Sequence, residues 1–437
     1  MEWWVILLLI VVGLMFIMLT GIPVAFAFFI MNFVILLIFS GQKALVLLPT
    51  GIMQSLSSFL LIAVPLFIFM GEVLFRTGIV NFFIDSVDKW LGRVPGRLSY
   101  AAIVSGTVLG ALSGSSIGVV AALGSSLIPE MQRRKYSRFM SIGPVLGAGG
   151  LDALIPPSAM AVIFAGLTML SAGKVLMAGM MPGILLAVLY ASFILIVSWW
   201  KPHLAPLYKL EHFAWTEKLK SLVLLLPIIL LIFVVLGIIF FGIATPTESA
   251  AVGAVGSLGL AFAYKRVRIS SRLLMEIFLK SAQTTSQVFF IVAGSATFGS
   301  VLAMTGAGQG LVRAVSGLQL PPNLVIVGMI VVVIIFGTLM DTVSNMMITA
   351  PIFIPLGISL GCNPIWLTTM LLAGIELGAL TPPFGMAIFV MQAVYPEASY
   401  REIIMAGLPY VAMEVLLIFL VMIFPIIALW LPSMMIR

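Results

Sequence analysis

Long apolar runs fill most of the chain, and short polar stretches separate them. Runs near 3–20, 23–40 and 52–75 come close to or exceed the ~20 residues that cross the hydrocarbon core of a bilayer as a helix. Strands of a transmembrane barrel alternate apolar and polar residues over about 10 positions, whereas these runs are continuously apolar. The pattern therefore predicts an all-α polytopic membrane protein and excludes a barrel.

Two later runs, 97–131 and 323–358, are interrupted at their centres by small and polar residues. The polar residues are Ser113, Ser115 and Ser116 in the first run and Asp341, Ser344 and Asn345 in the second. Ser115 and Asp341 are 226 positions apart. Polar centres that recur within apolar segments of a membrane protein indicate a binding site at the interface between two repeats.

Two further runs, 139–172 and 364–395, contain paired prolines. The pairs are Pro156-Pro157 and Pro382-Pro383, and the same offset of 226 positions relates them. Because proline lacks an N–H group and clashes with the preceding turn, each pair is expected to break its helix. The freed backbone groups cannot face lipid, so they are expected to line a cavity or a binding site.

Lysine and arginine residues predict how the runs cross the membrane. If 97–131 is a re-entrant hairpin with its serines at the tip, both of its ends lie on one side, where a basic cluster at 133–138 follows. The positive-inside rule makes that side cytoplasmic. Counting spans onward opens the second hairpin, 323–358, to the opposite side and places both chain termini in the periplasm.

The chain is therefore predicted to form two inverted repeats, 1–200 and 221–437, joined by a cytoplasmic linker at 201–220. Each repeat is expected to contain three spans, a re-entrant hairpin, a helix broken at Pro-Pro and a further span. Inverted repeats with broken helices are typical of secondary transporters.

Composition supports the membrane assignment, because 62% of the residues are hydrophobic and 8% are charged, against about 25% charged in a soluble domain. The single cysteine, Cys362, excludes an internal disulfide and a cysteine metal cage. The net charge of +7 comes from the loops and indicates topology rather than a nucleic-acid partner.

Five segments carry a resemblance to a known family. They are GALSGSSIGVVAALGS (110–125), GPVLGAGGLDALIPPSAM (143–160), GIATPTESAAVGA (242–254), TLMDTVSNMMITAPIFIPLG (338–357) and ELGALTPPFGMAIF (376–389). At these residues the chain resembles the large membrane subunit of tripartite ATP-independent periplasmic (TRAP) transporters, within a superfamily of elevator-type ion-coupled carriers.

The resemblance implies a secondary transporter of a bacterial or archaeal inner membrane. Such a transporter takes an organic anion, usually a carboxylate, from a soluble periplasmic binding protein and uses a sodium gradient. The resemblance also implies a small four-helix membrane subunit as a partner, no organic cofactor, and a mobile domain that slides against a scaffold. It does not identify which organic acid is carried.

By analogy with the family, each half is expected to hold one sodium ion, so at least two ions are expected. Helix ends at a hairpin tip or a break present carbonyl oxygens to a cation and N–H groups to a carboxylate. The expected sodium ligands are Ser113, Ser115, Ser116, Gly150 and Asp152 in the first half, and Asp341, Ser344, Asn345, Gly378 and Thr381 in the second. Glu376 precedes the second break as Asp152 precedes the first.

The substrate is expected between the two tips, where it would contact Ser116, Ser158, Thr342 or Thr381. Three other charged residues within or beside apolar runs have structural explanations. Glu248, in the sequence TPTES, is expected to cap a helix or to pair across the scaffold. Lys174 and Lys280 are expected to extend toward the lipid headgroups, as long cationic side chains do.

Two other classes fit parts of the pattern. A stand-alone carrier of the same superfamily, driven by sodium or by protons, would have the same hairpins and breaks. An intramembrane aspartyl protease would use Asp152 and Asp341 as paired carboxylates. That class carries G-x-G-D, whereas this chain has Gly149-Gly150-Leu151-Asp152, so the sequence favours a transporter over an enzyme.

Overall fold

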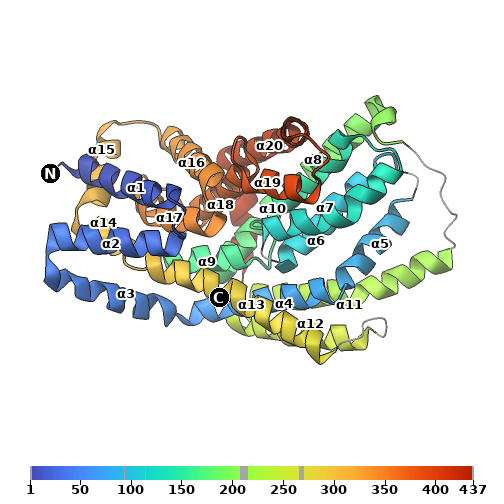
Figure 1. Ribbon diagram of the computed structural model, residues 1–437, viewed down its shortest axis with the longest axis horizontal. Helices are drawn as coiled ribbons and strands as arrows, with labels where there is room; N and C mark the ends of the chain where they lie inside the picture. Colours follow the sequence, from blue (N-terminus) through green and yellow to red (C-terminus); the bar gives the residue numbers. More distant parts are fainter. Residues whose placement is uncertain (1, 93, 114, 207–214, 265–269, 436–437) are drawn as a thin grey trace.

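A computed structural model describes residues 2–92, 94–113, 115–206, 215–264 and 270–435. Every regular element in these ranges is a helix (Figure 1). Among the described residues, seven helices or helix pairs are long and apolar enough to cross a membrane. The predicted all-α polytopic membrane fold is confirmed.

The helices of the first half run from the N-terminus to the linker. They are α1 (Trp3–Leu19), α2 (Val24–Ser40), η1 (Gln42–Val46), α3 (Leu47–Leu56), η2 (Phe59–Ile62), α4 (Ala63–Arg76), α5 (Ile79–Leu91), α6 (Arg97–Ser113), α7 (Ser116–Arg133), α8 (Arg138–Gly149), α9 (Ala159–Thr168), α10 (Ala172–Trp200) and η3 (Pro202–Leu204).

The helices of the second half follow the same order. They are α11 (Trp215–Phe240), α12 (Pro246–Ala263), α13 (Ser271–Ser295), α14 (Phe298–Met304), α15 (Ala307–Gly317), α16 (Pro322–Leu339), α17 (Thr342–Ser359), α18 (Pro364–Leu380), α19 (Met386–Val394), α20 (Tyr400–Ile423) and α21 (Ile426–Met434). Because α11 begins at Trp215, its first turns lie within the predicted linker 201–220, and residues 207–214 of that linker lie outside the described ranges.

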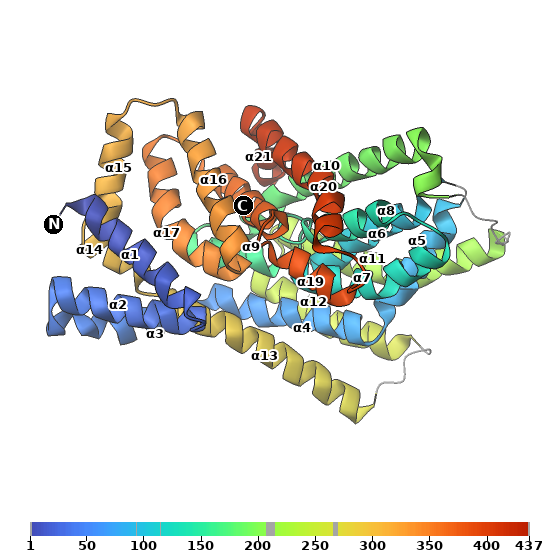
Figure 2. The same cartoon turned by 45° about the horizontal axis from the view of Figure 1, so that its top comes forward.

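Helices of the two halves contact each other in matched pairs. Helix α4 packs on α12 and α13 packs on α2, while α8 packs on α20 and α18 packs on α10. Helix α7 packs on α19, and its counterpart α17 packs on α9. Likewise α5 packs on α11, and its counterpart α15 packs on α1. In both views α1 and α15 lie at one end of the molecule and α5 and α11 at the other (Figures 1 and 2). The halves are therefore interlocked, and their inverted orientation in the bilayer stays a prediction.

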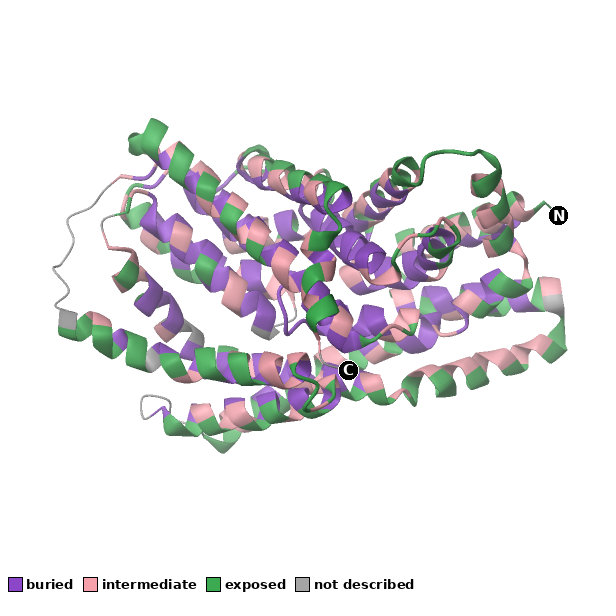
Figure 3. Ribbon diagram, turned by 180° about the vertical axis from the view of Figure 1, so that it is seen from behind, coloured by how far each residue is buried: buried purple, intermediate pink, exposed green. Residues whose placement is uncertain are grey.

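The first helices of the two Pro-Pro runs, α8 and α18, form the centre of the molecule. Every residue from Met140 to Gly149 and from Trp366 to Leu380 is buried. The outer helices instead show many exposed side chains (Figure 3), and in α11 these include Phe233, which is 73% exposed. Since lipid tails are as apolar as these side chains, the outer surface suits a bilayer, and close packing must hold the centre together.

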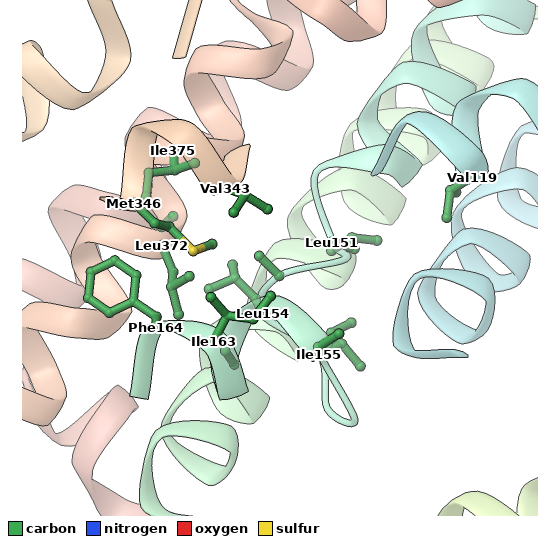
Figure 4. Packing of buried hydrophobic residues seen from close by; sticks show 14 of the residues in the cluster. Val119, Leu151, Leu154, Ile155, Ile163, Phe164, Val343, Met346, Leu372 and Ile375 are labelled. Carbon is green, nitrogen blue, oxygen red and sulfur yellow. The ribbon is translucent and has the colours of Figure 1, made fainter. Parts of the chain in front are cut away.

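Close packing in the centre depends on small residues and interlocking apolar side chains. A Cβ atom at Gly147 of α8 would overlap the ring of Tyr410 from α20. Phe164 of α9, Met346 of α17 and Leu372 of α18 lie together around the second hairpin (Figure 4). Small residues allow helix backbones to approach closely, which favours association within a bilayer.

Candidate functional site

The first hairpin tip lies where α6 ends at Ser113 and α7 begins at Ser116. Ser115 is the N-cap of α7, and its hydroxyl accepts a hydrogen bond from the Gly118 N–H at 3.1 Å. Such a cap satisfies one of the free N–H groups at a helix start. The side chain of Ser113, a predicted sodium ligand, lies outside what the structure describes.

The first broken helix packs directly on this hairpin. Helix α8 ends at Gly149, Gly150 is its C-cap, and α9 begins after Pro156-Pro157 with Ser158 as its N-cap. The Ser158 hydroxyl accepts from the Ala161 N–H at 3.3 Å. A Cβ atom at Gly110 of α6 would lie 3.0 Å from the Asp152 Cα, so the hairpin and the break approach backbone to backbone.

Asp152 is fully buried, and its carboxylate faces the backbone N–H groups of Ser115 and Ser116 at the start of α7. Within the described ranges, neither oxygen has a hydrogen-bond partner of standard geometry. A helix N-terminus carries about half a positive charge, which stabilises a carboxylate in this position. Asp152 thus lies where the first break contacts the first tip, and its role as a sodium ligand stays a prediction.

Glu376 of α18 extends this cluster across the two halves. The Ser116 hydroxyl donates to Glu376 Oε2 at 2.6 Å, and Glu376 is 1% exposed. Its other oxygen has no hydrogen-bond partner in the described part of the chain. Ser116 of the first half therefore contacts Glu376 of the second half. Its hydroxyl proton points to Glu376, so the lone pairs of its oxygen remain available to a ligand.

Glu414 and Tyr190 belong to the same buried region, and sequence reasoning missed them. The Tyr190 hydroxyl of α10 donates to Glu414 Oε1 of α20 at 2.7 Å. The Glu414 carboxylate lies against Gly150, where a Cβ atom would overlap it. The available signal was the charge itself, because an ionisable residue within an apolar run usually marks a functional or tightly packed position.

Replacing Tyr190 with phenylalanine is expected to lower the free energy of unfolding by about 1–3 kcal/mol, because Glu414 Oε1 loses its buried donor. Tyr410→Phe is the matched control, since the two rings pack at 5.0 Å and the buried Tyr410 hydroxyl has no hydrogen-bond partner among the described residues. Unfolding in detergent would measure both variants. Equal stabilities would contradict a role for the Tyr190 hydrogen bond.

The second hairpin tip lies where α16 ends at Leu339 and α17 begins at Thr342. Asp341 is the N-cap of α17, and its Oδ1 accepts from the Ser344 N–H at 3.0 Å. The Ser344 hydroxyl also donates to the Asp341 carboxylate. Asp341 and Thr342 are half-buried, so this tip presents a carboxylate at the position where the first tip presents a serine.

Asn345 and the second break complete the second cluster. Asn345 is fully buried, and its amide N–H donates to the Val333 carbonyl at 2.8 Å, which leaves its amide oxygen without a hydrogen-bond partner in the ranges described. A Cβ atom at Gly378 of α18 would lie 2.7 Å from the Gly337 Cα of α16. The second hairpin therefore packs on the second broken helix, just as the first hairpin packs on the first broken helix.

Thr381 follows α18 as its C-cap, ahead of Pro382-Pro383, and its hydroxyl donates to the Leu377 carbonyl at 2.6 Å. The structure thus places the predicted residues at the two hairpin tips and the two breaks, and their grouping around bound sodium ions stays a prediction. Among the described residues, no hydrogen bond joins the candidate substrate contacts Ser158, Thr342 and Thr381 to one another, so that assignment stays a prediction.

Glu248 caps α12 in a capping box with Thr245, as the sequence predicts.

The described residues contain no group of three His, Cys, Asp or Glu side chains placed to hold a metal ion. A cation bound at either tip would therefore use hydroxyl, amide and backbone carbonyl oxygens together with at most one or two carboxylates.

Comparisons with known proteins show the family of the chain. Residues 11–427 match the family model described as the tripartite ATP-independent periplasmic transporter, DctM component. The chain is 34% identical over 389 residues to the C4-dicarboxylate TRAP transporter large permease protein DctM of Pseudomonas aeruginosa, covering 88% of this chain and 89% of that protein. It is 27% identical to the ectoine TRAP transporter large permease protein TeaC of Halomonas elongata, covering 92% of each chain.

A solved structure also shares the fold. The YdaH transporter of Alcanivorax borkumensis superposes with a TM-score of 0.66 at 13% identity, covering 89% of each chain. At that identity the likeness shows the fold alone. The curated relatives are named as transporter permeases, which decides between the predicted transporter and the aspartyl protease in favour of the transporter.

Proposed function

Since the chain belongs to the DctM family of tripartite ATP-independent periplasmic transporters, we propose that it is the membrane subunit that imports an organic acid together with sodium ions. It is a multi-pass membrane transporter and not an enzyme. The observation that carries the coupling proposal is the pair of capped hairpin tips, Ser115 and Asp341, each beside a broken helix.

Two sodium ions are proposed, one at each cluster. The first would bind near Ser115, Ser116 and the carbonyl of Gly150, with Asp152 as a ligand or a close neighbour. The second would bind near Asp341, Ser344, Asn345 and the unwound backbone from Gly378 to Thr381. The Asn345 amide oxygen, buried without a hydrogen-bond partner in the described ranges, supports the second site, because such a group is costly unless a ligand satisfies it.

The substrate and partners are proposed from the family. Two relatives are named for C4-dicarboxylates and for ectoine, compounds that share a carboxylate group. The partners would be a periplasmic binding protein that delivers this acid and a small membrane subunit. The location would be a bacterial inner membrane, with both termini in the periplasm.

An elevator movement is proposed for the transport step. Hairpins α6–α7 and α16–α17 pack on the buried broken helices and would move with them as one body. The first two spans of each half would form the scaffold, and the second spans, α2 and α12, pack on the third spans of the other half, α13 and α4. Helices α5 and α15 would connect the two bodies. Differential sodium binding between states would drive the cycle, because a ligand that binds both states equally shifts nothing.

Uptake by proteoliposomes tests this proposal. The chain would be reconstituted with its small subunit, and its cognate binding protein would be added outside with radiolabelled ligand. Accumulation that requires both a sodium gradient and the binding protein is expected. Accumulation without the binding protein would indicate a stand-alone carrier, and accumulation that follows a pH gradient and ignores sodium would overturn sodium coupling.

A further inference from the structure

A cavity of about 400 Å³ separates the first hairpin tip from the predicted scaffold. Ser115 and Gly118 line it from the tip, Glu72 lines it from α4, and Lys280, Thr284 and Gln287 line it from α13. A small organic acid fits within this volume. The cavity is therefore large enough for a substrate, and it adjoins the tip that the sodium proposal uses.

Lys280 gives this cavity a positive charge. Its ammonium forms no ion pair with any described residue, whereas the cavity's carboxylate, Glu72, is paired with Arg76 at 2.7 Å. Lys280 also lies ten residues into the 34-residue apolar span of α13 and α14. An ionisable residue within a span is costly, so it usually faces a cavity and a partner. Lys280 is exposed and lines the cavity, and its predicted extension toward the lipid headgroups stays a prediction.

The repeat supplies an internal comparison. A second cavity of about 420 Å³ lies beside the second hairpin, where α3 and α13 face α9 and α17. Gln54, Ser55 and Ser58 line it from the first half. The polar side chains of the second cavity are neutral. The cavity at the first tip therefore differs from this one in that a lysine, Lys280, lines it.

We propose that Lys280 is a substrate-binding residue whose ammonium pairs with an acidic group of the transported organic anion in the cavity at the first tip. This inference rests on the proposed function for the transport of the anion, but not on sodium coupling. A lysine ammonium offers three donors on a flexible stem. The neighbouring Ser115, Thr284 and Gln287 side chains supply polar contacts for the rest of the ligand.

Cysteine labelling of the full chain in detergent tests the assignment. Thr284→Cys would be introduced together with Cys362→Ser, so that one thiol lies in the cavity. Its labelling rates would be compared for an anionic (sulfonatoethyl) and a cationic (trimethylammonioethyl) methanethiosulfonate. The ratio of anionic to cationic rates is expected to fall about tenfold on Lys280→Met, a change of about 1.4 kcal/mol, because a nearby positive charge attracts the anionic reagent and repels the cationic one. Lys280→Arg is expected to restore the ratio, and Lys174→Met, outside the cavity, is expected to leave it unchanged.

Protection by ligand tests binding itself. Succinate or gluconate, as a dicarboxylate and a sugar acid, is expected to slow labelling in the protein with Lys280 and not in the Lys280→Met protein. An unchanged rate ratio, or no protection by either acid, would overturn the assignment. Protection that depends on Lys280, combined with uptake that ignores sodium, would leave the anion site intact and overturn only the coupling.

Discussion

Replacing Asp341 with serine is expected to raise the sodium concentration for half-maximal uptake by about tenfold to a hundredfold. A charge-assisted contact contributes about 1.5–3 kcal/mol, and every 1.4 kcal/mol is about tenfold in affinity. Serine is the residue that caps the first hairpin at Ser115, so the variant gives the second tip the cap of the first. Sodium-dependent uptake in proteoliposomes would measure the change.

The substitution separates a ligand role from a capping role. Serine and aspartate cap helices about equally well, so Asp341→Ser should fold with nearly unchanged stability. A carboxylate within a span costs about 2.5–3.5 kcal/mol on insertion scales, and capping alone does not explain why it is present. Asp341→Asn, which also retains the cap, should show the same loss of sodium affinity. Normal sodium dependence in both variants would make Asp341 a structural cap only.

The hairpin tips and helix breaks were predictable because their chemistry acts locally. Proline breaks a helix through its own missing N–H, and both proline pairs lie in breaks. Helix α18 ends at Leu380, directly before Thr381 and Pro382, whereas α8 ends at Gly149, ahead of Pro156. Ser115 and Asp341 cap helices through bonds three residues away. Such short-range effects can be inferred from spacing alone, and the repeat doubled the evidence for each of them.

The long-range partners could not be predicted in the same way. Ser116 bonds Glu376 across 260 positions, and Tyr190 bonds Glu414 across 224. None of these pairs is related by the 226-position offset, because Glu376 corresponds to Gly150 and Tyr190 to a leucine, Leu416. The carboxylates thus lie where the two halves differ. The repeat therefore predicted the hairpins and the broken helices. The partners of the residues that differ between the halves could be known only from the tertiary contacts.

The surroundings of Lys280 also could not be predicted from the sequence. Its place in an apolar run predicts a headgroup contact, which stays a prediction, and the sequence does not show which face of α13 turns toward the tip of the first hairpin. Only the packing of α13 beside α4 brings it to the cavity with Ser115. A charge within a span indicates that a partner or a cavity exists, but its identity depends on helix rotation.

Replacing Gly150 with alanine is expected to lower the free energy of unfolding by about 2–3 kcal/mol and to abolish uptake. Gly150 has φ −69° and ψ −5°, a helical conformation that alanine adopts readily, so the backbone itself is not strained. The added methyl group would overlap the Glu414 carboxylate and approach the Leu380 Cδ1 at 2.9 Å. Overpacking a tight core typically costs about 1–3 kcal/mol. Unfolding in detergent and uptake in proteoliposomes would measure the two effects.

Gly166→Ala in α9 is the matched control, because its nearest side-chain atoms would lie at 3.7 Å and 3.8 Å from the new methyl group. Alanine is favoured over glycine within a helix by about 1 kcal/mol, so this variant should be as stable as the parent or more stable. Shortening the opposing side chain in Gly150→Ala/Glu414→Asp should recover part of the lost stability, since the overlap involves the end of that carboxylate. If Gly150→Ala were as stable as Gly166→Ala, the break and α20 would not be in the tight contact that positions the first cluster, and the carbonyl at Gly150 would have no fixed place beside Ser116.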